Sequence, residues 1–119
     1  MDRETARANL EKLREEFATS LAALRERLAE PQRDSSDIAT VDQHPADIAT
    51  DTAERELDVS RSAMYEARVA QIEQAFARLE QGTYGICISC GEPIPDERLA
   101  VVADTPYCVA DAQREQARQ

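Results

Sequence analysis

All three cysteines of the chain lie in one stretch, with a spacing typical of metal-binding proteins. Cys87 and Cys90 form a C-x2-C pair followed directly by Gly91, and seventeen residues separate Cys90 from Cys108. A two-residue spacing lets two thiolates converge on one ion, and zinc takes four ligands in a tetrahedral arrangement. The pattern therefore predicts a ribbon-like finger with one structural zinc ion per chain.

An aspartate holds the fourth ligand position of this predicted finger. Asp111 lies three residues after Cys108, where a complete ribbon would have Cys or His. Three thiolates and one carboxylate can hold zinc, although more weakly than four thiolates. We expect Asp111 to be the fourth ligand. Two alternatives stay open, namely a finger that folds without metal and a redox role for the thiols.

The charge of the chain and the motifs that it lacks argue against several classes of function. The net charge of −10, with Lys12 as the single lysine, disfavours direct binding to DNA, which depends on neutralising phosphates. The sequence offers no nucleophile–base pair and no phosphate-binding loop, so we do not expect an enzyme. It has no apolar run of membrane-spanning length and no signal peptide at its start, which predicts a cytoplasmic protein with reduced thiols and no membrane partner.

Two long stretches have the apolar spacing of helices that pair with each other. Residues 2–30 and about 45–81 are predicted helices: Pro31 ends the first, Pro45 suits the first position of the second, and Gly82 follows it. A capping box formed by Asp51 and Glu54 leaves a later start of the second helix open. In the first, the apolar stripe is Leu10, Leu13, Phe17, Leu21, Leu24 and Leu28. In the second, it is Tyr65, Val69, Ile72, Phe76 and Leu79, continued upstream with a one-residue drift by Leu57, Ser60 and Met64.

A short connection between two such helices favours antiparallel pairing within one chain. The predicted contacts join Phe17 to Tyr65 and Val69, Leu10 to Ile72 and Phe76, and Leu24 and Leu28 to Leu57 and Val59. The fold class is therefore mainly α, with a long coiled-coil hairpin before the finger. We expect a monomer, and the alternative is that each stripe serves a dimer.

The finger itself is predicted to contain short strands at residues 84–86 and 100–107 and a final helix at 109–117. Arg114 and Arg118 would lie near the negative end of that helix. We expect two domains, a hairpin at 1–81 with its tip around 31–50, and the zinc-finger-like end at 82–119.

Two motifs make the chain resemble the DksA/TraR family of bacterial transcription regulators, from residue 2 to about residue 113. The first is Gly-Thr-Tyr-Gly-Ile-Cys at 82–87, with Cys90, Gly91 and Cys108. The second is Asp-Gln-His-Pro-Ala-Asp-Ile-Ala at 42–49, which is similar to the tip of the YteA-like branch.

The resemblance implies a protein that binds RNA polymerase rather than DNA. Its hairpin would enter the secondary channel, and its tip would modulate promoter open complexes. Asp47 and Ala49 match the family's Asp-x-Ala tip motif, with Asp47 as the functional carboxylate. His44 stands where better studied members have a second aspartate, and Asp42 is a candidate substitute. A guanosine alarmone at the polymerase interface is a further implied partner.

Other functions and roles stay open beside this one. Asp47 is also a good helix-start cap. The same fold could serve as a protein-interaction module without polymerase regulation. The three thiols could instead form a thiol or zinc redox sensor.

Overall fold

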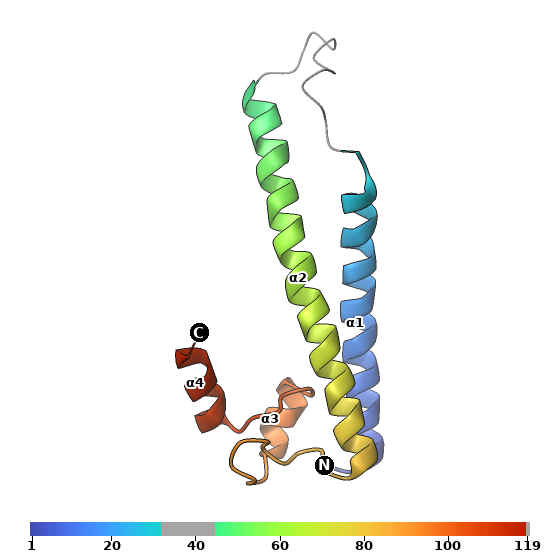
Figure 1. Cartoon of the computed structure of the whole chain (residues 1–119). Helices are drawn as coiled ribbons and strands as arrows, with labels where there is room; N and C mark the ends of the chain where they lie inside the picture. The colour runs from blue at the N-terminus through green and yellow to red at the C-terminus, as the bar shows by residue number, and fades with distance from the viewer. Residues whose placement is uncertain (32–44, 119) are drawn as a thin grey trace. The chain divides into compact units, whose positions relative to one another are not determined.

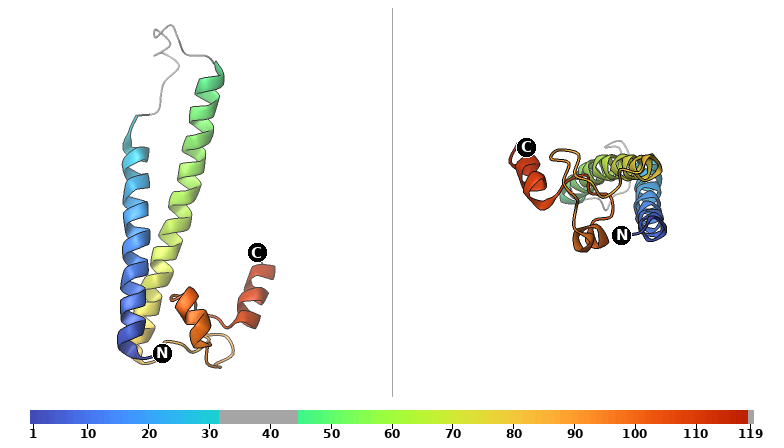
Figure 2. Two further views of the ribbon diagram at one scale, coloured as in Figure 1. Left: turned by 180° about the vertical axis from the view of Figure 1, so that it is seen from behind. Right: turned by 90° about the horizontal axis from the view of Figure 1, so that it is seen from below.

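A computed structural model describes residues 1–31 and 45–118 of the chain. The described residues form the helices α1 (Arg3–Ala29), α2 (Pro45–Gln81), α3 (Asp96–Val101) and α4 (Val109–Ala117). The helices α1 and α2 run antiparallel and side by side, as Figure 1 and the reverse view in Figure 2 show. The predicted helical hairpin, followed by a cysteine cluster and a short final helix, is confirmed.

The chain divides into two compact units. Unit 1 comprises Met1–Phe17 and Arg68–Gln119, and unit 2 comprises Ala18–Ala67. Unit 1 therefore holds the base of the hairpin together with the finger. Unit 2 holds the rest of both long helices.

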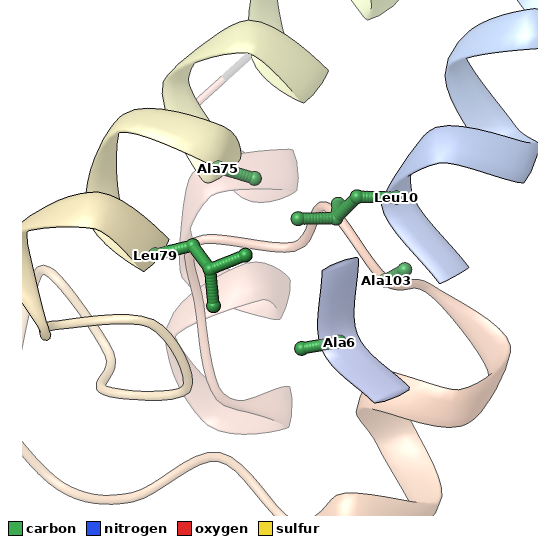
Figure 3. Packing of buried hydrophobic residues seen from close by; sticks show 5 residues of the cluster. All are labelled: Ala6, Leu10, Ala75, Leu79 and Ala103. Atoms are coloured by element: carbon green, nitrogen blue, oxygen red, sulfur yellow. The ribbon is translucent and has the colours of Figure 1, made fainter. Parts of the chain in front are cut away.

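Small residues let three segments of unit 1 pack closely at the base of the hairpin. Leu10 of α1 and Leu79 of α2 point toward each other (Figure 3) and are 0% and 4% exposed. The other buried members of this cluster are Ala6, Ala75 and Ala103. Because alanine has only a methyl side chain, Ala103 from the finger fits directly against both helices. The finger is thus part of the core that closes the base.

Charges of opposite sign flank the seam between α1 and α2. In unit 1, Arg3 and Arg7 both bind Glu80, at 3.1 and 2.8 Å, and Arg14 binds Glu73 at 3.2 Å. In unit 2, Arg25 binds Glu66. Each exposed pair contributes only about 0.2–1 kcal/mol. In all of these pairs the cation belongs to α1 and the carboxylate to α2, so the set favours pairing of α1 with α2 over pairing of two like helices.

The buried stripe of unit 2 differs from the prediction. The sequence placed Leu57 and Val59 against Leu24 and Leu28, with Met64 in the same stripe. Leu57, Val59 and Met64 are instead 50%, 53% and 67% exposed. Asp58 and Ser62 are buried in their place. The predicted one-residue drift of the stripe was therefore wrong. The spacing of four and three residues continues without interruption from Leu79 through Tyr65 to Ser62 and Asp58, which places these two polar residues in the buried stripe.

The buried carboxylate of Asp58 is held by cations from both helices. Arg27 of α1 contacts it at 2.8 Å and Arg61 of α2 at 3.8 Å. Nearby, Arg55 donates hydrogen bonds to the carbonyl oxygens of Leu28 and Glu30, at 2.9 and 3.3 Å. The last carbonyls of a helix have no partner within it, so Arg55 caps the end of α1.

We expect Asp58→Leu to raise the free energy of unfolding by about 1 kcal/mol or more, since apolar replacements of buried ion pairs are often stabilising. Arg27 and Arg61 are both about half exposed, so water would solvate them after the change. Urea denaturation of the two proteins at pH 7 measures the difference. A clear loss of stability would show instead that the ion pairs outweigh the cost of burying the carboxylate.

Candidate metal centre

Glycines with positive φ shape the start of the finger. Gly82, at φ +79°, ends α2, and the amide of Thr83 donates to the carbonyl oxygen of Arg78 at 2.9 Å. This is the predicted cap, since glycine adopts the left-handed conformation without steric cost. Gly91, at φ +76°, turns the chain after Cys90, and its amide donates to the carbonyl oxygen of Cys87 at 2.9 Å. The C-x2-C pair is therefore folded into a tight turn.

A helix occupies part of the region where the sequence predicted a strand. Residues 96–101 form α3, and the finger's described residues contain only an isolated antiparallel bridge between Ile86 and Pro93. Pro95 and two acidic residues, Asp96 and Glu97, precede and begin α3. Proline near a helix start and carboxylates in its first turn favour a helix, which outweighed the β-branched Val101 and Val102. The strands at 84–86 and 100–107 were thus wrong.

The second half of the cluster lies at the start of α4. This helix spans Val109–Ala117, which confirms the predicted final helix. Cys108 precedes it as the N-cap residue, and Asp111 lies in its first turn with 4% of its surface exposed. A carboxylate near a helix N-terminus is electrostatically favoured. Because the first turn of α4 separates them by three residues, the side chains of Cys108 and Asp111 lie close together, with 3.1 Å between Sγ and Oδ2.

The four predicted ligands come together in the structure. One ligand atom from each of Cys87, Cys90, Cys108 and Asp111 lies within 4.8 Å of all the others. The Sγ atoms of Cys90 and Cys108 are 3.9 Å apart. Tetrahedral zinc with Zn–S bonds of about 2.3 Å places sulfurs roughly 3.8 Å apart. The cluster could hold a metal ion with little rearrangement.

Asp111 faces the thiols through one oxygen and an arginine through the other. Cys87 and Cys108 each donate to its Oδ2 at 3.1 Å, while Arg114 contacts its Oδ1 at 3.2 Å. The hydrogen bonds from the thiols of Cys87, Cys90 and Cys108, with the nearby Arg114 charge, lower the pKa of Asp111 to about 2. The carboxylate is therefore ionised at neutral pH and presents a negatively charged oxygen to the cluster.

The thiol of Cys90 lies in an environment that is unfavourable for its ionisation in the absence of a cation. A backbone hydrogen bond from Glu92 lowers the pKa of Cys90, but the Asp111 carboxylate, burial and the two other thiols outweigh it and raise that pKa to about 12. Because metals bind thiolates, binding must release protons from this cluster. Metal affinity is accordingly expected to rise with pH.

Apolar packing and a backbone hydrogen bond hold the two halves of the cluster together. Cys87, Ile94 and Leu99 form a small buried core, and Tyr84, Tyr107 and Cys108 pack against it. The amide of Ile88, in the first half, donates to the carbonyl oxygen of Pro106 at 2.9 Å. The relative placement of the ligands thus depends on the segment that leads into Cys108.

Of the predicted tip residues, Asp47 and Ala49 belong to unit 2, whereas the cysteine cluster belongs to unit 1. Asp42 and His44 fall outside the described residues. Asp47 belongs to the first turn of α2, and Ala49 is exposed on the same helix. Two buried carboxylates, Asp58 and Asp104, were not among the residues predicted from the sequence. The unbroken four-three spacing could have identified Asp58, whereas Asp104 has partners at least 33 residues away in the sequence and gave no local signal.

None of the described helices is both long and apolar enough to span a membrane. The long helices have charged residues spread along their length, which accounts for this.

Comparison with known proteins defines the class of this chain. Residues 82–117 match the model of the prokaryotic dksA/traR C4-type zinc finger. An uncharacterised protein of Aquifex aeolicus (strain VF5) is 33% identical over 107 residues, with 87% of this chain and 74% of that protein covered. The chain therefore belongs to the dksA/traR C4-type zinc finger family.

Two further relatives match shorter parts of the chain. The uncharacterised protein YteA of Bacillus subtilis (strain 168) is 40% identical over 63 residues, which cover 53% of this chain and 26% of YteA. The RNA polymerase-binding transcription factor DksA of Caulobacter vibrioides is 31% identical over 74 residues, which cover 62% of this chain and 52% of that protein. The match therefore spans about half of that DksA and a quarter of YteA.

The fold also has a solved counterpart. The structure of transcription factor DksA2 from Pseudomonas aeruginosa superposes with a TM-score of 0.76, covering 98% of this chain and 84% of that chain at 23% identity. This likeness shows that the two proteins share a fold. The family finger is described as C4-type, and this chain departs from four cysteines because it has Asp111 beside Cys87, Cys90 and Cys108.

Proposed function

We propose that this protein is a bacterial transcription regulator that binds RNA polymerase at the secondary channel and modulates promoter open complexes through the tip of its hairpin. The observation that carries the proposal is the hairpin fold of a dksA/traR family member, with an Asp-x-Ala motif at the start of α2. A DksA relative that covers 62% of this chain is an RNA polymerase-binding transcription factor. We infer that the protein acts as a monomer, without direct contact to DNA.

Charge and position suit this role. The chain is strongly acidic, and a channel that admits nucleotide anions provides a positively charged environment for an acidic hairpin. Asp47 lies in the first turn of α2, beside the connection between the helices. A carboxylate there is suited to approach a magnesium-bearing active site, since magnesium binds oxygen ligands. Asp42 and His44 would assist it, and a guanosine alarmone would act at the same polymerase interface.

The cysteine cluster would have a structural role in this protein. One zinc ion would be held by Cys87, Cys90, Cys108 and Asp111, and it would fix the finger that closes the base of the hairpin. Three thiolates and a carboxylate are a donor set that zinc accepts. No step of the proposed regulation passes through the metal. Its contribution is to the folding of unit 1.

The proposal predicts that Asp47→Asn removes most of the effect on open complexes while leaving polymerase binding intact. A hydrogen bond made by a charged group is worth about 1.5–3 kcal/mol, so the effect should weaken about tenfold or more. The measurement is the lifetime of open complexes on a promoter that forms short-lived ones, with purified polymerase. Asp37→Asn is a matched control, because Asp37 begins a second copy of the Asp-Ile-Ala-Thr sequence found at 47–50.

Three results distinguish a regulator that acts through Asp47 from a protein that does not use this carboxylate and from an interaction module. Loss of activity in Asp47→Asn alone supports the proposed role of this carboxylate. Equal activity of the native protein and Asp47→Asn would refute it. Binding to polymerase without any change in open complexes would favour an interaction module of the same fold.

A thiol-based sensor is the second candidate function, and the exposure of Cys90 beside Cys108 favours it. Mild peroxide treatment should then reduce both the zinc content and the number of free thiols. If neither quantity changes at a peroxide dose that oxidises a reference thiol protein, the sensor function is excluded.

A further inference from the structure

We propose that Asp104 is a positioning residue of the metal centre, which fastens the segment Ala103–Cys108 to α2 so that metal binding and packing of the hairpin base are thermodynamically coupled. This inference rests on the proposed zinc site. Asp104 lies four residues before Cys108 and is not among the predicted ligands.

Asp104 is completely buried, with 0% of its surface exposed. Both of its oxygens are occupied by α2. Arg68 donates from Nη2 to Oδ1 at 2.7 Å and from Nε to Oδ2, and Gln71 donates from Nε2 to Oδ2 at 2.8 Å. A carboxylate removed from water this thoroughly is tolerated only with such partners, because the unpaired charge would cost several kcal/mol. The burial therefore ties the position of Asp104 to α2.

The neighbours of Asp104 hold the same end of the segment. Arg68 also lies over the ring of Phe17 of α1, 4.9 Å from its centre, so its guanidinium is held from two sides. Ala103 is part of the buried cluster at the base. Its carbonyl oxygen accepts a hydrogen bond from the hydroxyl of Tyr84 at 2.8 Å. The start of the segment is thus fixed to α1, α2 and the beginning of the finger.

The remaining residues up to the ligand Cys108 are also held. Arg98 of α3 donates to the carbonyl oxygen of Tyr107 at 3.0 Å and to Oγ1 of Thr105 at 3.3 Å. The carbonyl oxygen of Pro106 accepts from the amide of Ile88, which follows the ligand Cys87. Since each residue between Asp104 and Cys108 is fixed, a displacement of Asp104 is expected to displace the Cys108 sulfur.

Coupling of this kind must act in both directions. If metal binding strengthens the attachment of the segment Ala103–Cys108 to α2 by some factor, then loss of that attachment must weaken metal binding by the same factor. Residues that orient metal ligands without binding the metal typically change affinity by about 10–100-fold when they are mutated. We expect Asp104→Asn and Arg68→Gln each to weaken zinc binding about tenfold.

The test is zinc affinity, measured by competition with a chromophoric chelator on the full chain at pH 7. Cobalt substitution adds a spectroscopic readout, because its absorption reports the geometry of the thiolate ligands. Asp58→Asn is the matched control, since Asp58 is also buried and paired with arginine but belongs to unit 2. It should lower the melting temperature while zinc affinity and the cobalt spectrum stay native. Chelation should also lower the melting temperature of Asp104→Asn by less than that of the native protein.

Native zinc affinity in an Asp104→Asn protein with reduced stability would overturn the inference, since Asp104 would then serve folding alone. If Asp104→Asn does not fold, Gln71→Ala removes a single hydrogen bond, and a severalfold weaker zinc affinity is expected from it. Native zinc affinity in both single variants, Gln71→Ala and Arg68→Lys, would also overturn the proposed coupling. Failure of the native chain to bind zinc would instead refute the proposed metal site, and the inference with it.

Discussion

Replacing Cys87 by serine should abolish tight zinc binding and cause the largest loss of thermal stability of any single change in the finger. Cys87 is 1% exposed and belongs to the same small core as Ile94 and Leu99. Removal of one of four ligands eliminates much of the metal's contribution to folding, which reaches about 10–16 kcal/mol in small zinc domains. The smaller and more polar serine side chain also loses apolar packing against Ile94 and Leu99, although Asp111 Oδ2 stays available as a hydrogen-bond acceptor. The measurements are zinc content and melting temperature.

Cys90→Ser separates these two contributions, because Cys90 is exposed. Both variants should lose zinc. With excess chelator, Cys90→Ser should melt at the temperature of the metal-free native protein, whereas Cys87→Ser should melt below it. A native protein whose melting temperature does not change on chelation would contradict a structural role for the metal.

Leu10→Ala should destabilise the protein by about 2–5 kcal/mol, because it leaves a cavity at the centre of unit 1. Leu10 is fully buried and packs with Ala75, Leu79 and Ala103, which are too small or too constrained to fill the space. Such a loss is a large part of the stability of a small domain. Urea denaturation followed by circular dichroism measures it.

Leu57→Ala is the control for this prediction, since the same atoms are removed from a side chain that is 50% exposed. We expect a change several times smaller than for Leu10→Ala. Similar losses in the two variants would show that Leu57 is buried in solution and that the apolar stripe drifts as the sequence alone suggested.

The elements with strong local signals could be predicted from the sequence. Pro45, Gly82 and the leucine stripe of α1 define the long helices, because proline and glycine restrict where a helix begins and ends. The cysteine spacing likewise identified four side chains that the structure brings together. In each case the signal lies within a few residues of the feature.

The features that the sequence did not reveal depend on distant partners or on competing local signals. Asp58 was not predicted to be buried because its apolar neighbour Leu57 suggested a one-residue drift of the stripe along α2. The segment 100–107 was predicted to be a strand because of its valines, although Asp96 and Glu97 start a helix. Asp104 pairs with Arg68, which lies on another element, and local sequence patterns carry no record of such a contact.

Binding of the purified chain to core RNA polymerase is the most direct test of the proposed function. A fluorescently labelled chain titrated with core enzyme, without DNA, should show saturable binding with one chain per polymerase. A fragment that blocks the secondary channel should compete with it, and metal removal should weaken it by unfolding unit 1. Absence of binding to core enzyme, or binding that requires DNA, would contradict the proposal that this protein regulates transcription through the polymerase.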